Sequence, residues 1–143
     1  MADLLTKYPA TSSVDVVISL ASEPTNAQGV FLAGQASTAV DNTATLDLDH
    51  LLSGVIVAGS VAPTVSRSIN VYAYAASSTA SGVPTYPDGI TGTDASKTMT
   101  SANVMNSALK FVASITIDAT ASRAYTFAPV SMAGVFGGVL PKF

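Results

Sequence analysis

Alternation of apolar and polar residues is the strongest pattern along this chain, and it predicts β-strands. It is clearest over residues 109–118, where every second side chain is apolar and the intervening set is more polar. Such alternation is typical of a half-buried strand in an antiparallel sheet. The residues expected on the apolar face are Leu109, Phe111, Ala113, Ile115 and Ile117. Residues 67–75 alternate in the same way, with Asn70, Tyr72 and Tyr74 on the more polar face.

Further strands are expected where short β-branched or apolar runs end at turn residues. These runs cover residues 14–20, 29–40, 45–49, 51–58 and 123–128. The second run is ambiguous, with a strand possible on either side of Gly34. Within the fourth run, Gly54 indicates a bulge or a close approach of another chain segment. The last run follows 109–118 after a short linker, so the two together resemble a β-hairpin.

The remaining segments lack this alternation. Residues 1–13 are expected to be an extended N-terminal segment, and residues 76–99 a long loop that either grips a neighbour or lies mobile on the surface. Residues 131–136 predict one helical turn, with Ser131 as N-cap and Gly137 as its stop. No repeat of solenoid length occurs. We therefore expect a single all-β, mostly antiparallel domain over 1–143, a β-sandwich or jelly-roll-like fold with at most one short helix.

Composition changes the picture, because charged residues make up only 10% of the chain, against roughly 25% in ordinary soluble domains. A surface so poor in charge suits a protein that lies against other subunits. The alternative is a small monomer with a Ser/Thr-rich β surface. The six Lys and Arg residues are scattered, so we expect no direct nucleic-acid partner. No signal peptide and no apolar run of about 20 residues is present, so we expect cytoplasmic synthesis and no membrane insertion.

The inventory of reactive groups is thin, with one histidine, one glutamate and no cysteine. In the D-L-D-H run, a strand would point Asp47 and Asp49 to one face and His50 to the other, which disfavours a metal site. A Ser-His-Asp triad would have to use His50, and no G-x-S-x-G elbow is present. Asp88 and Asp94 are interpreted as turn formers. We expect no catalytic, metal or cofactor-binding residues, no small-molecule substrate, and no enzymatic activity.

Aromatic residues supply the candidate interface, because tyrosine and other aromatics are enriched where proteins meet. The candidates are Tyr72, Tyr74, Tyr86 and Phe143. For Tyr72 and Tyr74, ordinary packing beneath a loop is the alternative. Phe143 either packs into a partner or marks a sequence shorter than the native one, which would leave the C-terminus truncated.

Three stretches in this order, residues 36–48 (ASTAVDNTATLDL), 67–74 (RSINVYAY) and 129–141 (PVSMAGVFGGVLP), resemble small virion structural proteins of tailed bacteriophages. In that group the G-G-x-L-P segment is usually followed by a further apolar strand. The resemblance implies a capsid decoration (cement) protein on the outside of the phage head, made in the host cytoplasm. It also implies two partners, the major capsid protein and copies of the chain itself, commonly as a homotrimer.

Three other functions remain open at this stage. A tail-tube, neck or other tail structural protein would share the composition and the resemblance. A receptor- or glycan-binding β module would be expected to carry more exposed aromatics and a charged or Trp-bearing pocket, and the chain has no tryptophan. A hydrolase would have to use His50.

Overall fold

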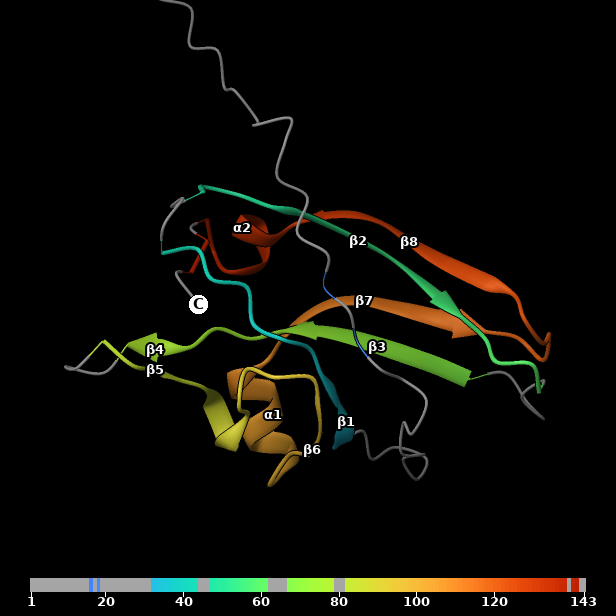
Figure 1. Cartoon of the computed structure of the whole chain (residues 1–143), viewed down its shortest axis with the longest axis horizontal. Coiled ribbons are helices and arrows are strands. Elements are labelled where there is room, and N and C mark those ends of the chain that lie inside the picture. The colour runs from blue at the N-terminus through green and yellow to red at the C-terminus, as the bar shows by residue number, and fades with distance from the viewer. Residues whose placement is uncertain are drawn as a thin grey trace, which may run out of the picture.

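The computed structural model describes residues 16, 18, 32–43, 47–61, 67–78, 82–138 and 140–141. Within them, antiparallel strands dominate, and every sheet has two strands (Figure 1). The pairs are β1 (Ala33–Ala36) with β6 (Ala95–Thr98), β2 (Leu51–Val57) with β8 (Ala124–Ser131), β3 (Arg67–Ala73) with β7 (Lys110–Ile117), and β4 (Ser77–Ser78) with β5 (Pro84–Thr85). The all-β, mostly antiparallel class is confirmed. The segment 1–13 and nearly all of the strand predicted at 14–20 lie outside the described residues.

The β3–β7 ribbon confirms the two clearest strand predictions and corrects one detail. Ile69 pairs with Ile115, and Ile115 and Ile117 are buried. The register then shifts, because Val71 pairs with Ala113 whereas Tyr72 pairs with Phe111, which leaves an extra residue on β7. A bulge of this kind reverses the alternation beyond it. Phe111 was expected on the buried face and instead lies beside Tyr72, 57% exposed.

The β2–β8 ribbon confirms both predictions made for Gly54, a bulge and a close approach of another segment. Gly54 pairs with Phe127, and a Cβ at position 54 would lie 2.4 Å from Phe127 Cε1, so the ring approaches the backbone closely. The register also shifts between Leu52 and Gly54, with the extra residue on β8. Pro129 lies within this bulge, where the N–H that proline lacks is not needed for the ladder.

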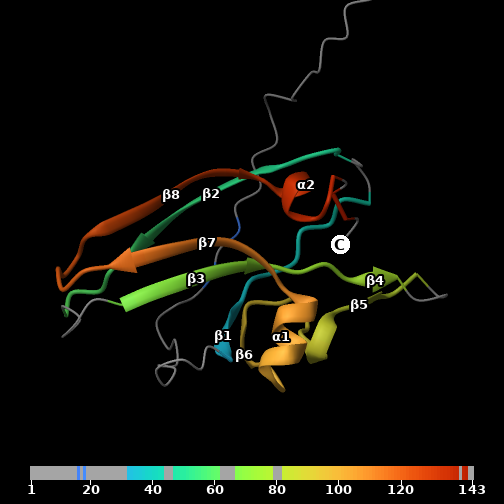
Figure 2. The ribbon, with the colours of Figure 1, turned by 180° about the vertical axis from the view of Figure 1, so that it is seen from behind.

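The predicted hairpin between residues 109–118 and 123–128 is wrong in its pairing. β7 pairs with β3 and β8 pairs with β2, so the turn at 118–123 carries the chain from one ribbon to the other. Figures 1 and 2 show the two ribbons one above the other, with β7 next to β8. Alternation reports which face of a strand is buried, and it carries no information on which strand is the partner.

The expectation of a long structureless loop over 76–99 is also wrong. The segment contains β4, β5, a 3-10 helix η1 (Pro87–Gly89) and β6. The β1–β6 ladder continues where the Met99 N–H donates to the Leu32 carbonyl oxygen, 2.8 Å away. Asp88 and Gly89 have φ angles of 51° and 71°, so the Pro-Asp-Gly run is a turn as predicted. Strands of two to four residues are too short to show alternation in a sequence.

Two short α-helices complete the described fold, where at most one was expected. α2 (Met132–Val135) is the predicted turn, and the Ser131 hydroxyl accepts a hydrogen bond from the Gly134 N–H at 3.0 Å. Gly137, with a φ of 87°, follows its end. α1 (Ala102–Ala108) was not predicted, because seven residues make only about two turns, too few to establish a helical period. Its cap is Ser101, whose hydroxyl accepts from the Val104 N–H.

The core of the described residues is thin. Its buried apolar side chains are Ile90, Met99, Ile115, Ile117 and Ala133, and no described side chain is less than 2% exposed. Several large aliphatic side chains, above all on β2, lie in solvent instead.

Candidate functional site

The most apolar exposed surface of a sheet belongs to the β2–β8 ribbon. Along β2 the exposed and half-buried residues alternate, and Leu51, Val55 and Val57 are 63%, 62% and 66% exposed. Their inward neighbours, including Gly54 and Ile56, are partly covered. The exposed residues of the ribbon, here called the β2–β8 outer face, are Leu51, Ser53, Val55, Val57, Ala124, Thr126, Ala128 and Pro129.

No residue of the β2–β8 outer face carries a charge. Charged groups lie at its two ends instead. At one end, Asp49 accepts a hydrogen bond from the Ala133 N–H at 2.8 Å, and this bond lowers the pKa of the carboxyl. At the other end, Arg123 forms an ion pair with Asp118. The face between them offers apolar and neutral polar contact area, which is the chemistry of a protein contact and not of an ionic ligand.

The turn beside the face is held by Asp118. Its Oδ1 accepts hydrogen bonds from the Tyr125 hydroxyl at 2.5 Å and from the Thr120 N–H at 3.0 Å. These bonds, the tyrosine bond first, lower the pKa of Asp118 to about 2, and the Arg123 guanidinium adds to the effect. The Ser122 N–H donates to the Gly59 carbonyl oxygen at 2.9 Å, which joins the turn to the chain just after β2. The end of the ribbon is therefore fixed by polar contacts.

A second exposed feature lies on the β3–β7 ribbon. Tyr72 and Phe111 form an edge-to-face pair with ring centroids 5.8 Å apart, a geometry that aromatic quadrupoles favour. The polar residues Asn70 and Ser114 pair next to them on the same side. Tyr72, one of the predicted interface residues, is thus half-buried beside an exposed phenyl ring. Sequence reasoning missed Phe111, because the bulge that turns it outward has no sequence signal.

The tyrosines Tyr74 and Tyr86 have internal contacts. Their rings meet edge to face at 5.9 Å, and the Tyr74 hydroxyl donates to the Ser37 carbonyl oxygen at 3.2 Å. Burial raises the pKa of Tyr74. A Cβ at Gly92 would lie 2.6 Å from Tyr86 Cε2, so this ring also packs against backbone. Their role at an interface stays a prediction, as does that of Phe143, which lies outside the described residues.

The strand predicted over residues 45–49 is not formed in its described part, residues 47–49, and His50 is not in a strand either. The side chain of buried Asn42 takes the place of a partner strand, because it accepts from the Asp47 N–H at 2.7 Å and donates to the Asp47 carbonyl oxygen at 3.0 Å. His50 Nε2 lies 3.5 Å from Asp47 Oδ2, so these two side chains share a side, contrary to the strand-based expectation. Asp49 turns to α2. Within the described residues no three potential ligands gather.

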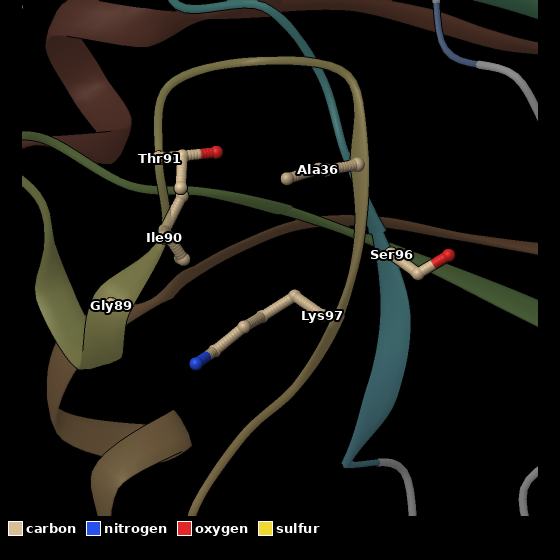
Figure 3. A pocket seen from close by; sticks show the side chains of 7 residues that line it. Ala36, Gly89, Ile90, Thr91, Ser96 and Lys97 are labelled. Carbon is tan, nitrogen blue, oxygen red and sulfur yellow. The ribbon is translucent and has the colours of Figure 1, made fainter.

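A small pocket lies between η1, β1 and β6 (Figure 3). Its volume is about 60 Å³, and its polar lining includes Thr91, Ser96 and Lys97. Lys97 Nζ lies 3.8 Å from Asp88 Oδ2, so the cation already has an anionic neighbour. Pockets for small ligands measure roughly 300–1,000 Å³, whereas one water takes about 30 Å³. This pocket is far smaller than a site for a small ligand.

Comparison with protein-family models, with curated proteins and with solved structures finds no match to this chain. Among the described residues, no helix is long and apolar enough to cross a membrane. The function is therefore argued from the chemistry of the surfaces themselves.

Sequence reasoning missed the residues of the β2–β8 outer face, although a signal was present. Residues 51–57 read LLSGVIV, which places apolar side chains on both faces of the strand. In an antiparallel sheet with one buried face, the outward positions are usually polar. An apolar run on both faces of such a strand therefore indicates a second surface that is to be covered, here by Leu51, Val55 and Val57.

Proposed function

We propose that the protein is a structural component of a tailed-phage virion, a capsid decoration (cement) protein that stabilises the head through contacts between subunits. The observation that carries the proposal is the β2–β8 outer face, an exposed apolar strand surface without charge. Larger exposed apolar patches rimmed by polar residues mark sites of interaction with other proteins. The resemblance of residues 36–48, 67–74 and 129–141 to virion proteins supplies the kind of assembly.

The physical role of such a protein requires no chemistry. A binder that engages only the assembled shell stabilises it by mass action, by RT ln(1 + [L]/Kd). Full burial of an exposed aliphatic side chain contributes about 1.5–3 kcal/mol. Leu51, Val55 and Val57, each more than 60% exposed, would together contribute several kcal/mol once covered by a neighbouring subunit. The partners in this proposal are the major capsid protein and further copies of the chain, as the homotrimer that the resemblance implies.

For the architecture, we propose that the β2–β8 and β3–β7 ribbons are the two layers of a small β-sandwich. Support comes from the inward position of Ile115 and Ile117 on one ribbon and of Phe127 on the other. The Tyr125–Asp118 hydrogen bond ties the two layers together at the turn. Sandwich layers pack about 10 Å apart with their inner side chains interdigitated.

The proposal is tested with particles that lack the protein, to which purified chain is added back. The wild-type chain is expected to sediment with the heads and to raise the temperature at which they release DNA. The variant Val55→Lys places a charge in the β2–β8 outer face and is expected to be retained several-fold less. Asn106→Lys, on an exposed position of α1, is the matched control and is expected to bind as the wild type does. Wild-type chain that stays in the supernatant would contradict the proposal, and immunogold labelling on tails alone would favour a tail protein.

A further inference from the structure

We propose that the Asp88–Gly89 bond is a site of spontaneous isoaspartate formation, and that Thr100 slows this reaction by holding the Asp88 carboxylate. The modification brings one carbon of the aspartate side chain into the main chain and needs no enzyme or cofactor. The inference stands on the turn between β5 and β6 and does not depend on the proposed function.

The sequence makes this bond the most reactive of its kind in the chain. In the reaction, the backbone nitrogen of the following residue attacks the side-chain carboxyl of aspartate. Glycine hinders that nitrogen least, because it has no Cβ. Asp88–Gly89 is the only Asp-Gly pair among the 143 residues, and no Asn-Gly pair occurs. Gly89 is exposed, so water has access to the bond.

The chemistry proceeds in two steps. The Gly89 nitrogen forms a bond to Cγ of Asp88, and the carboxyl hydroxyl leaves as water with the amide proton, which gives a five-membered succinimide ring. Water then opens the ring. Addition at Cγ restores the aspartate. Addition at the main-chain carbonyl leaves Gly89 attached through Cγ and frees the α-carboxylate, and this product is isoaspartate.

Thr100 opposes the first step through both carboxylate oxygens. Its N–H donates to Asp88 Oδ2 at 2.8 Å, and its hydroxyl donates to Oδ1 at 2.6 Å. The hydroxyl bond, followed by the N–H bond, lowers the pKa of Asp88, and the Lys97 cation adds to the effect. The hydroxyl can leave only from a protonated carboxyl, whereas hydrogen bonds to the carboxylate favour its charged form. The same two bonds fix the orientation of the side chain.

The backbone of the turn opposes ring closure as well. Asp88 has a φ of 51° and a ψ of 31°, in the left-handed region that residues with a Cβ seldom adopt. At this ψ the Gly89 nitrogen and the Asp88 Cβ lie nearly opposite each other across the Cα–C bond. A five-membered ring requires them on the same side, so the turn has to open first. The Thr100 bonds keep it closed, because they connect η1 to the residue before the Ser101 cap of α1.

Isoaspartate at position 88 would remove these contacts. The additional main-chain carbon lengthens the turn, and the carboxylate moves from the side chain to the main chain, away from Thr100. The link between η1 and the start of α1 is thereby lost. In an assembly whose subunits are not replaced, such damage accumulates, and the contact between Asp88 and Thr100 determines how fast.

The test compares rates of isoaspartate formation. The wild-type chain and a peptide of residues 85–91 are aged side by side at neutral pH and elevated temperature. Isoaspartate at position 88 is measured by liquid chromatography with mass spectrometry and by methyl transfer from a protein isoaspartate methyltransferase. The folded chain is expected to react several-fold more slowly than the peptide. Thr100→Val, which loses the hydroxyl and keeps the N–H, is expected to react several-fold faster than the wild type.

Two further variants are controls. Thr100→Ser keeps both donors, and Thr91→Val removes an exposed hydroxyl that bonds to Thr93. Both are expected to age at the wild-type rate. Circular dichroism establishes that each variant is folded, and Thr100→Ala replaces Thr100→Val if the latter does not fold.

Three results would overturn the proposal. Absence of isoaspartate from both the chain and the peptide would remove the site. A folded chain that reacts as fast as the peptide would remove the protection by the fold, and this comparison needs no variant. A folded Thr100→Val or Thr100→Ala chain that ages at the wild-type rate would remove the role of Thr100.

Discussion

Gly54 of β2 lies directly opposite Phe127 of β8, and the phenyl ring occupies the space that a side chain at position 54 would need. The ring packs on the inner side of the ribbon, while Val55 and Val57 lie on the outer side. Because Gly54 has no side chain, the Phe127 ring can lie against the backbone of β2 while the two strands stay paired. That pairing sets which residues form the β2–β8 outer face. The same pair of strands therefore carries both a packing contact that stabilises the fold and the exposed β2–β8 outer face.

Gly54→Ala is expected to destabilise the fold, because the new Cβ would lie 2.4 Å from Phe127 Cε1 and the ring would have to move. Overpacking of this kind costs about 1–3 kcal/mol. Chemical denaturation followed by circular dichroism measures the difference. Gly59→Ala, where a Cβ would meet nothing within 4 Å, is the matched control and should change the free energy of unfolding little. Equal stabilities of the two variants would show that Phe127 does not pack on Gly54.

Tyr125→Phe is expected to raise the pKa of Asp118 from about 2 toward its ordinary value of 3.8, because the tyrosine bond is the largest cause of the shift. Carbonyl-carbon NMR of the labelled carboxyl follows this titration directly. A pKa of Asp118 that stays unchanged in Tyr125→Phe would mean that this hydrogen bond is absent.

The lowered pKa of Asp118 also makes the stability of the fold depend on pH. Because the pKa of Asp118 is depressed in the folded chain, its contribution is complete above pH 3.8 and is lost as the pH falls toward about 2. In Asp118→Asn the fall of stability across this window should be less steep than in the wild type. Thermal melts at pH 5, 4, 3 and 2 measure it, and identical slopes for the two chains would contradict the assignment.

Asn42→Ala is expected to destabilise the segment before β2. Asn42 is 4% exposed, and its amide makes both hydrogen bonds to the Asp47 backbone. Leaving these backbone groups without their partner costs about 1–3 kcal/mol. Asn106→Ala, at an exposed position of α1, removes the same side chain without this burial and should leave the stability at or slightly above the wild-type value. Similar losses for both variants would argue against the role of Asn42.

Val55→Lys is expected to separate folding from assembly. Val55 is 62% exposed, so the lysine ammonium can remain in water in the free chain. The free energy of unfolding should change by less than about 1 kcal/mol, the span of β-propensity effects. Retention on heads should fall several-fold, as argued above. Wild-type retention, with the fold intact, would remove the β2–β8 outer face from the contacts that the protein makes.

The sequence predicts those elements whose signal is local. Alternation over seven or eight residues identifies β3 and β7, and a serine cap with a glycine stop identifies α2. The bulge opposite Tyr72 is not predictable in this way, because it depends on how two strands 40 residues apart fit together. The backbone at Asp47, and with it the contact between Asp47 and His50, is held by Asn42. No local sequence pattern predicts that this polar residue is buried.

The candidate surface was only partly predictable for a similar reason. Tyr72 was identified from its residue type, whereas Phe111 reached the surface through the bulge. The apolar residues of β2 were not singled out, because the sequence does not say which of two apolar faces of a strand has a covering layer within the chain. That distinction appears only in the structure, where Leu51, Val55 and Val57 are exposed and their neighbours along β2 are partly covered.

The copy number of this protein in purified particles decides whether it is a subunit of the virion shell. Quantitative mass spectrometry would compare peptides of this chain with those of the major capsid protein. For a decoration protein, we expect a number of copies comparable to that of the capsid subunits. A few copies per particle would move the protein to the neck, tail or fibre, and its absence from the particle would rule out a role in the virion.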